Sequence, residues 1–251
     1  MFTSYSKLAT AVYDLDKPLG HSLKDVEYYQ ERLRGMKKRI LEVAVGSGRM
    51  LIPLLEAGLI VDGVDNSSEM LASCKARCAE LGLQPMLYEE DMQSLSLPHQ
   101  YGAIIIPAGS FQLLEDREDA LQALDSFYHH LQPGGRLILD LFIPKEFTIN
   151  HRTTRSWITP EKELITLETT LVEVDLLQQK NVSYLRYEKW CEGKLMETEL
   201  QRLPIRWYGV EEFQMILKSI GFTQITRSGG YQYGKEPVDS HEMITYEAIK
   251  P

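Results

Sequence analysis

The chain has 251 residues, enough for one large domain or two small ones with a substantial hydrophobic core. Apolar residues make up 43% and charged residues 25% of the sequence, which argues against disordered, collagen-like and coiled-coil proteins. The formal net charge is −9 and the longest basic run is only Lys37-Lys38-Arg39, so a nucleic acid is not the expected partner.

The sequence also carries no signal for a membrane. The first residues lack the basic and apolar regions of a signal peptide, and no stretch approaches about 18 continuous apolar residues. Three cysteines fit a reducing compartment better than a disulfide framework. We therefore expect a cytoplasmic protein that does not bind membranes.

In chain order, the first predicted element is a helix over residues 23–34, which ends at Gly35. Strands and helices then alternate, which predicts a mainly parallel sheet with helices on both faces. The expected strands are residues 39–45, 60–64, 86–88, 103–106 and 136–142, and the expected helices are residues 50–58, 67–81 and 119–131.

After Pro144 the pattern changes to runs rich in Thr, Val, Leu and Tyr, which predict antiparallel strands within residues 155–206. The alternation in Leu164–Leu176 slips by one residue near Leu171, which indicates a β-bulge or two shorter strands. Further along, a helix over residues 210–221 and strands over 222–226 and 243–249 are expected to complete the first sheet.

These elements predict an α/β fold. Its core is a doubly wound, Rossmann-like, seven-stranded and mostly parallel sheet with an antiparallel terminal strand, and a β-rich antiparallel insertion is added to it. We expect a single domain over residues 1–251. The expected parts are a ligand-binding α/β core at 36–149 and 207–251, the insertion at 150–206 and an N-terminal cap at 1–35.

A turn with two glycines follows the first expected strand. Gly46 and Gly48 allow the backbone to approach a ligand at the start of the next helix. Leu51 stands where a dinucleotide fingerprint has its third glycine, and the carboxylate of Glu42 would repel a diphosphate. A carboxylate at this place suits a ligand that presents an ammonium group and no phosphate.

Two further acids stand at the ends of the next two strands. Asp65 is placed to accept hydrogen bonds from a ribose diol, and Asp91 to accept one from the exocyclic amine of adenine. Ribose, adenine and an amino-acid moiety without phosphate together describe S-adenosylmethionine.

With these motifs in order, residues 36–143 resemble the class I S-adenosylmethionine-dependent methyltransferases. The resemblance places the E-x-G-x-G-x-G loop of that family at Glu42–Gly48, its ribose acid at Asp65 and its adenine-side acid at Asp91 with Met92. The signature after the last helix falls on Leu131–Gly135. Ala44 stands in place of the first glycine of the loop, so the backbone is expected to approach the cofactor slightly less closely.

The outer parts of the chain resemble bacterial small-molecule methyltransferases, a group that includes sugar-amine and glycine-type N-methyltransferases. The residues that carry this similarity are Tyr13-Asp14, Tyr28-Tyr29 and Trp207-Tyr208-Gly209. After the strand 103–106 the sequence reads Pro107-Ala108-Gly109, so the D/N-P-P-Y signature of enzymes that methylate exocyclic amines is absent.

The resemblance implies S-adenosyl-L-methionine as cofactor and in-line transfer of its methyl group to a nitrogen or oxygen of a small molecule. The predicted cofactor contacts are Tyr13, Glu42, Ala44, Gly46, Gly48, Arg49, Asp65, Asn66, Met70, Asp91, Met92 and Pro107. Candidates for removing a proton from the acceptor are His241, in the terminal hairpin, and Tyr13, on an N-terminal segment that covers the cofactor in such enzymes.

Several residues also have ordinary structural roles open to them. Asn66 can cap a helix, Met70 can belong to the core, and Arg49 can be an exposed helix residue. Cys74 and Cys78 have no second pair of metal ligands, so we expect core packing and no metal site.

Two other functions stay open at this stage: a catalytically silent methyltransferase-like binding domain, and a nicotinamide oxidoreductase. The oligomeric state is expected to be a monomer or a homodimer. For the insertion we expect a wall of the acceptor pocket, with an extension of the sheet or a dimer contact as the alternative. The residues expected in that wall are Tyr184, Tyr187, Trp190 and Arg206.

Overall fold

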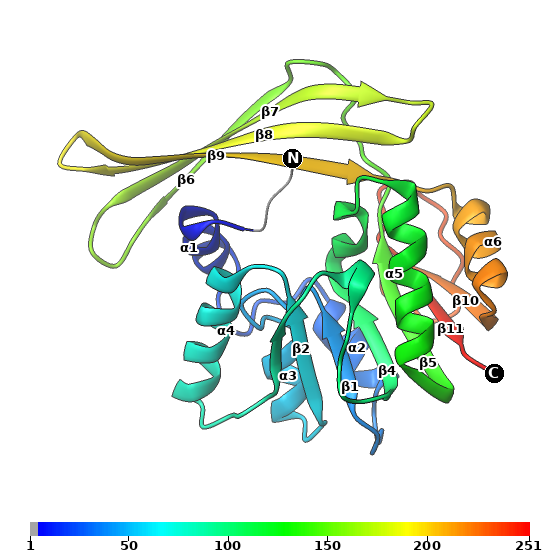
Figure 1. Cartoon of the computed structure of the whole chain (residues 1–251). Coiled ribbons are helices and arrows are strands. Elements are labelled where there is room, and N and C mark those ends of the chain that lie inside the picture. The colour runs from blue at the N-terminus through cyan, green and yellow to red at the C-terminus, as the bar shows by residue number, and fades with distance from the viewer. Residues whose placement is uncertain (1–4) are drawn as a thin grey trace.

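The structure is a computed structural model that describes residues 5–251, and it contains two β-sheets (Figure 1). The larger sheet has seven strands in the order β10-β11-β5-β4-β1-β2-β3. Its strands are β1 (Ile40–Val43), β2 (Val61–Asp65), β3 (Leu87–Glu89), β4 (Tyr101–Ile106), β5 (Leu131–Leu141), β10 (Thr223–Gly229) and β11 (Ile244–Ile249). The pairings of β11 with β5 and with β10 are antiparallel and the other pairings in this sheet are parallel, so the predicted fold class is confirmed.

Helices cover both faces of this sheet, as the alternation of strands and helices predicts (Figure 1). The helices are α2 (Asp25–Arg32), α3 (Leu51–Glu56), α4 (Ser68–Glu80), α5 (Arg117–His130) and α6 (Val210–Ile220), with short 3₁₀ segments η1 (Met92–Ser94) and η2 (Pro107–Leu113). On the central strand β4, Ile104 and Ile106 pack in the core under α5 and α6, whereas Ile105 packs under α2, α3 and α4. Burial of both faces explains why the central strands are continuous apolar runs.

The second sheet is antiparallel and has the order β6-β7-β8-β9. Its strands are β6 (Arg152–Ile158), β7 (Leu164–Asp175), β8 (Lys180–Cys191) and β9 (Lys194–Arg206). The register of β7 against β8 shifts between Leu171 and Glu173, so the predicted β-bulge is confirmed and β7 is a single strand.

One helix, α1 (Lys7–Asp16), was not predicted from the sequence. It lies between α4 and the second sheet (Figure 1). Leu8 and Val12 of α1 pack in a small core with Ile165, Leu185 and Tyr187 of the second sheet. Because the partners of this helix lie more than 150 residues away, its stability comes from tertiary packing rather than from a local pattern.

The second sheet is also joined to the segment that follows η2. The carboxylate of Glu115 accepts hydrogen bonds from Arg202 at 2.7 Å and from Lys180 at 3.2 Å. Arg206 donates to the backbone carbonyl of the same residue at 2.7 Å. The hydrogen bonds from Arg202, and less strongly those from Lys180, lower the pKa of Glu115 to about 2.

None of the helices in the described part of the chain is long and apolar enough to cross a membrane.

The Glu115 contacts lead to a stability prediction. We expect Glu115→Gln to lower the free energy of unfolding by about 1 kcal/mol at pH 7, because partly exposed ion pairs contribute modestly. The pKa of the carboxyl group is depressed in the folded protein, so its contribution is present above the ordinary value of 4.5 and is lost as the pH falls towards 2. Urea unfolding at pH 7, 4 and 3 measures the difference from wild type, which should shrink in that order.

The exposed Glu56 provides the matched control, Glu56→Gln, which should change the unfolding free energy by only a few tenths of a kcal/mol at each pH. A loss in Glu115→Gln that stays constant down to pH 3 would contradict this account.

Candidate functional site

A cavity of about 300 Å³ opens at the carboxyl ends of β1, β2 and β3. Eight of the residues predicted to bind a cofactor line it: Tyr13, Ala44, Gly46, Asp65, Asn66, Met70, Asp91 and Met92. The structure therefore brings together residues that come from four separate segments of the sequence. In open α/β sheets this edge is where ligands bind.

Asp65 holds the glycine turn in place. One of its carboxylate oxygens accepts a hydrogen bond from the backbone N–H of Gly46 at 2.8 Å, and the other accepts from the N–H of Ser67 at 2.9 Å. Burial raises the pKa of Asp65, and these backbone hydrogen bonds oppose that rise. Ser67 in turn caps α4 by accepting from the N–H of Met70 at 3.1 Å.

Ala44, which stands in place of the family glycine, has a left-handed backbone conformation. Its φ is +55°, and Gly46 and Gly48 follow at +55° and +86°. A left-handed conformation is uncommon for alanine, so the turn keeps its shape at a cost in strain. Ala44 still lines the cavity with its Cβ present.

Glu42 lies in β1 directly below this turn. Its side chain is 3% exposed, and its Oε2 atom has no hydrogen-bond partner among the described residues. Burial raises the pKa of Glu42 well above its usual range, although the nearby Arg49 guanidinium opposes the rise. A buried carboxyl oxygen without a partner is costly, and a bound cation or donor would satisfy it.

Arg49, which we predicted as a cofactor contact, is buried and does not line the cavity. Its guanidinium forms an ion pair with Asp25 at 2.5 Å and donates to the carbonyl of His21 at 3.4 Å. The exposed-residue alternative for Arg49 is therefore wrong. Gly48 and Pro107, also predicted as cofactor contacts, are buried and do not line the cavity. Gly48 packs against Cys74 of α4, and Pro107 is the first residue of η2.

Asn66 and Asp91 lie at the other end of the cavity. The Asn66 amide donates to Asp91 Oδ1 at 2.9 Å, and both side chains are exposed. Asn66 follows β2 and Asp91 follows β3, so this hydrogen bond joins the ends of two neighbouring strands and fixes Asp91 at the cavity rim. Met70 is 2% exposed yet reaches the lining, so it is both a core and a cavity residue.

The N-terminal segment closes the cavity from above. Its rings, Tyr5 and Tyr13, line the cavity and meet edge to face with centroids 6.2 Å apart. The carbonyl of Tyr5 accepts from Ser67 Oγ at 2.8 Å. Sequence reasoning missed Tyr5, because no motif marks an aromatic residue before an unpredicted helix. Burial raises the pKa of Tyr13, so this hydroxyl stays protonated at neutral pH and is a poor general base.

His241 is not brought to the site. It is exposed, lies outside the cavity lining, and its backbone N–H donates to Asp239 at 2.8 Å. The terminal hairpin does reach the sheet edge, but through Tyr231 rather than His241. The geometry therefore gives no support to His241 as a base.

None of the four residues expected in a wall of the acceptor pocket lines this cavity, so their role there stays a prediction. Among residues of β6–β9, only Pro204 lines the cavity. Tyr184 is exposed, Tyr187 packs against α1, and Arg206 bonds backbone carbonyls of residues 115 and 178. Trp190 lies far along β8, beside Leu195 of β9.

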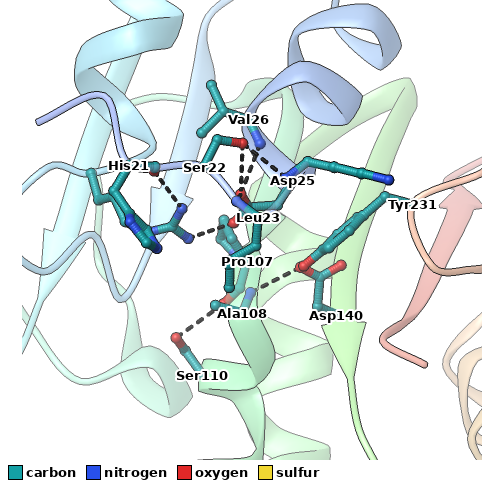
Figure 2. Close-up of polar contacts among 12 residues, drawn as sticks. His21, Ser22, Leu23, Asp25, Val26, Pro107, Ala108, Ser110, Asp140 and Tyr231 are labelled. Carbon is teal, nitrogen blue, oxygen red and sulfur yellow. Dashed lines mark hydrogen bonds and ion pairs between the residues drawn. The ribbon is translucent and has the colours of Figure 1, made fainter. Parts of the chain in front are cut away.

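A second group of polar residues lies beside the cavity, at the ends of β4 and β5 (Figure 2). The carboxylate of Asp140 accepts hydrogen bonds from the backbone N–H of Ala108 at 2.8 Å and from the Tyr231 hydroxyl at 3.1 Å. Asp140 was missed because it sits inside an apolar strand. A single acid within Leu137–Leu141 was nevertheless a readable signal, since carboxylates are rarely buried without a purpose.

Cys74 and Cys78 are buried in the core, as expected. Within residues 5–251, no group of three or more His, Cys, Asp or Glu side chains is arranged to hold a metal ion.

Comparison with known proteins agrees with this geometry. Residues 40–135 match the family described as a methyltransferase domain. The chain is 28% identical over 218 residues to "Putative methyltransferase YqeM" of Bacillus subtilis (strain 168), with 85% of each chain covered. It is 36% identical over 115 residues to a glycine/sarcosine N-methyltransferase of Halorhodospira halochloris, with 45% of this chain and 43% of that protein covered.

Among solved structures, an S-adenosylmethionine-dependent methyltransferase from Clostridium acetobutylicum superposes with a TM-score of 0.76 at 19% identity, over 95% of this chain and 96% of that one. Residues 40–135 are therefore a methyltransferase domain, and the chain has the fold of S-adenosylmethionine-dependent methyltransferases. Both findings agree with the resemblance to S-adenosylmethionine-dependent methyltransferases that the sequence motifs indicate.

The packing of Gly48 gives a prediction for the turn. A Cβ atom on Gly48 would lie 2.9 Å from Cys74 Sγ, and its φ of +86° disfavours any side chain. We expect Gly48→Ala to lower the free energy of unfolding by roughly 2–4 kcal/mol, the sum of backbone strain and overpacking.

Gly58 is the matched control, because it has a φ of +80° and nothing within 4 Å of a built Cβ. Gly58→Ala should cost only the backbone strain, about 1–2 kcal/mol. Chemical denaturation of both variants measures the difference. Equal losses would show that contact with Cys74 does not constrain the turn.

Proposed function

We propose that this protein transfers the methyl group of S-adenosylmethionine to a nitrogen or oxygen atom of a small molecule. The observation that carries the proposal is the cavity between the glycine turn, Asp65 and Asp91. Glu42 does not itself line this cavity, but it precedes the lining residues Val43 and Ala44 in the chain, and its buried Oε2 has no partner among the described residues. The methyltransferase match covers the strands and turns that form it.

The residues present fit this cofactor. Each carboxylate oxygen of Asp65 accepts one backbone N–H and keeps a lone pair for a ribose hydroxyl. Asn66, Asp91 and Met92 line the end suited to adenine. Glu42 and the Arg49 guanidinium do not line the cavity, but each has a buried polar atom without a partner among the described residues, Oε2 and Nε. We assign these two groups to the amino-acid moiety of the cofactor.

The protein's part in catalysis is then orientation and exclusion of water. When bound, S-adenosylmethionine supplies a methyl group that is already activated by its sulfonium. Tyr5 and Tyr13 cover the cavity, so the reacting atoms would be shielded from solvent. The left-handed turn at Ala44 and the Asp65 hydrogen bonds fix the backbone that positions the cofactor.

The charges around the cavity favour an amine as the acceptor. Five acids line it besides Asp65, and no lysine or arginine of the described chain belongs to the lining. These acids are Glu90, Asp91, Glu115, Asp116 and Asp119. One of the five, Glu115, is already paired with Arg202 and Lys180, so the other four carry the negative charge of the rim. Such a rim attracts a cationic amine and repels a phosphorylated acceptor. Relatives named as glycine/sarcosine and amino-sugar N-methyltransferases agree with this choice.

The function is tested by calorimetry with S-adenosylmethionine and S-adenosylhomocysteine, followed by transfer of radiolabelled methyl to a panel of amines. The panel is glycine, sarcosine, an amino sugar and a peptide with a free N-terminus. Binding with turnover of a panel amine supports the proposal. Binding without turnover of any acceptor favours a silent domain, and binding of NADH instead favours an oxidoreductase.

Asp65 gives a quantitative prediction for cofactor binding. Hydrogen bonds to a charged acceptor contribute about 1.5–3 kcal/mol each, so Asp65→Ala should weaken S-adenosylmethionine binding at least tenfold. Asp65→Asn keeps one acceptor oxygen, so its affinity for S-adenosylmethionine should lie between that of wild type and that of Asp65→Ala. Equal affinity of folded Asp65→Ala and wild type in calorimetry would reject the assignment of Asp65 to the ribose.

The raised pKa of Glu42 leads to a prediction of how the affinity for S-adenosylmethionine depends on pH. Its pKa is raised in the free protein, so the group binds a proton that must leave when a cationic ammonium is placed beside it. Affinity for S-adenosylmethionine should therefore fall as the pH is lowered, with release of a proton on binding. Calorimetry in buffers of different ionisation enthalpy measures that proton, and in Glu42→Gln the release should disappear.

A further inference from the structure

Asp140 is a buried carboxylate whose partners are all uncharged. Its exposure is 0%, and it accepts hydrogen bonds from Thr245 Oγ1 at 2.7 Å, Ala108 N at 2.8 Å and Tyr231 OH at 3.1 Å. Among residues 5–251 no lysine or arginine forms an ion pair with it. Burying an acid without a cation is costly, and such acids concentrate at functional sites.

The backbone around Asp140 is strained at two places. Ala108 and Tyr231 both have φ of +58°, and both donate to the same oxygen, Oδ2 of Asp140. A left-handed conformation is rare for a residue as bulky as tyrosine. Two strained residues from separate loops that meet on one buried carboxylate indicate a site that the rest of the fold holds in place.

The position of Asp140 relative to the cavity is set by the sheet. The strand order β5-β4-β1-β2-β3 places Asp65 and Asp91 on one side of β1 and Asp140 on the other. The Arg49–Asp25 ion pair is close to both groups, because its charges affect the pKa of Tyr13 and that of Tyr231. Figure 2 shows the loop from His21 to Val26 facing the Pro107–Ser110 turn and the Tyr231–Asp140 pair. Ala108 is exposed there and Tyr231 is half-buried, so both residues are reachable from solvent on this side.

We propose that Tyr231 contacts the methyl acceptor and that Asp140, through Tyr231, takes the proton that the acceptor loses. The inference rests on the proposed methyl transfer and adds the groups that remove the proton. The acceptor amine reacts in its neutral form, after its ammonium proton has been lost to solvent. The nitrogen lone pair forms a bond to the methyl carbon while the carbon–sulfur bond breaks, and sulfur keeps that electron pair. The nitrogen then gives a proton to the Tyr231 oxygen as the Tyr231 hydroxyl proton moves to Oδ2 of Asp140. The products are the neutral methylated amine, a neutral tyrosine and a protonated carboxyl group, which later loses its proton to solvent.

The protonation states agree with this direction of transfer. Burial raises the pKa of Asp140 to about 6, opposed by the hydrogen bonds from Thr245, Ala108 and Tyr231. At neutral pH the group is therefore a carboxylate that can accept a proton. Burial also raises the pKa of Tyr231, so that tyrosine stays neutral and can relay a proton without becoming a stable anion.

The other groups that face this pair come from three directions. Tyr29 of α2 faces Asp140, and Thr245 of β11 bonds the second oxygen of Asp140. The Asp25–Arg49 pair and the ring of Tyr28 face Tyr231. Of these, only Asp25 and Arg49 are charged at neutral pH, and their charges compensate each other in an ion pair. Titration near pH 6 in this region is therefore expected from Asp140.

The first arm of the experiment needs no acceptor. Tyrosine labelled with ¹³C at Cζ is followed by NMR from pH 5 to 8, with and without S-adenosylhomocysteine. The Tyr231 signal, assigned by its loss in Tyr231→Phe, should shift with a midpoint near pH 6 and should stay constant in Asp140→Asn. A Tyr231 signal that does not titrate, or that titrates equally in Asp140→Asn, overturns the pair.

The second arm measures turnover with the panel amine that is methylated fastest. Tyr231→Phe should lower kcat about 100-fold, within the range for a general base, with the affinity for S-adenosylmethionine unchanged within about twofold. Asp140→Asn should lower kcat similarly and remove the rise of kcat around pH 6.

The matched control is Tyr28→Phe. The Tyr28 hydroxyl donates to Glu247 at 2.8 Å, and its ring centroid lies 5.7 Å from that of Tyr231, so the same atom is removed next to the pair. Its kcat should stay within threefold of wild type. A Tyr231→Phe variant as active as Tyr28→Phe overturns the proposal. Failure of the wild type to bind S-adenosylmethionine would instead overturn the proposed function, and the NMR titration without cofactor would still report on the pair.

Discussion

The structure depends on carboxylates buried at the carboxyl ends of neighbouring parallel strands. Asp65 and Asp140 are each held by backbone N–H groups from the turn that follows an adjacent strand, Gly46 for one and Ala108 for the other. A buried acid is stable only when its oxygens are satisfied, so each carboxylate forces its turn into one conformation. The same hydrogen bonds that compensate for burial therefore build the floor of the site.

This constraint also accounts for three of the nine non-glycine residues that have a positive φ in the described chain. Ala44, Ala108 and Tyr231 are left-handed without being glycine, and each lies at or next to a turn bonded to one of these acids. Glu42 is the exception, since one of its oxygens has no partner within the described chain. The edge of the sheet thus has one unsatisfied acid on the side of the cavity and a satisfied one on the side of β5.

Local patterns predicted the parts of the fold that local forces determine. The turn at Gly46–Gly48, the acid Asp65 and the bulge near Leu171 follow from residue types at short spacing, and each was located correctly. The positions of His241 and of the expected wall residues, such as Tyr187, depend on how distant segments pack, and the sequence offered no short-range signal for them. Helix α1 was missed for the same reason, because its apolar face is matched only by the second sheet.

That packing gives the second sheet an indirect effect on the cavity. The sheet contributes only Pro204 to the lining, but the Glu199 carboxylate accepts hydrogen bonds from Ser6 Oγ and from the N–H of Leu8 at 3.0 Å. These bonds fix the start of α1, and with it the two tyrosines, Tyr5 and Tyr13, that cover the site. Since Glu115 ties the same sheet to the segment after η2, a change in the position of the sheet would move both the cover and the rim of the cavity. The sheet therefore acts on the site through the segments that it holds rather than through side chains of its own.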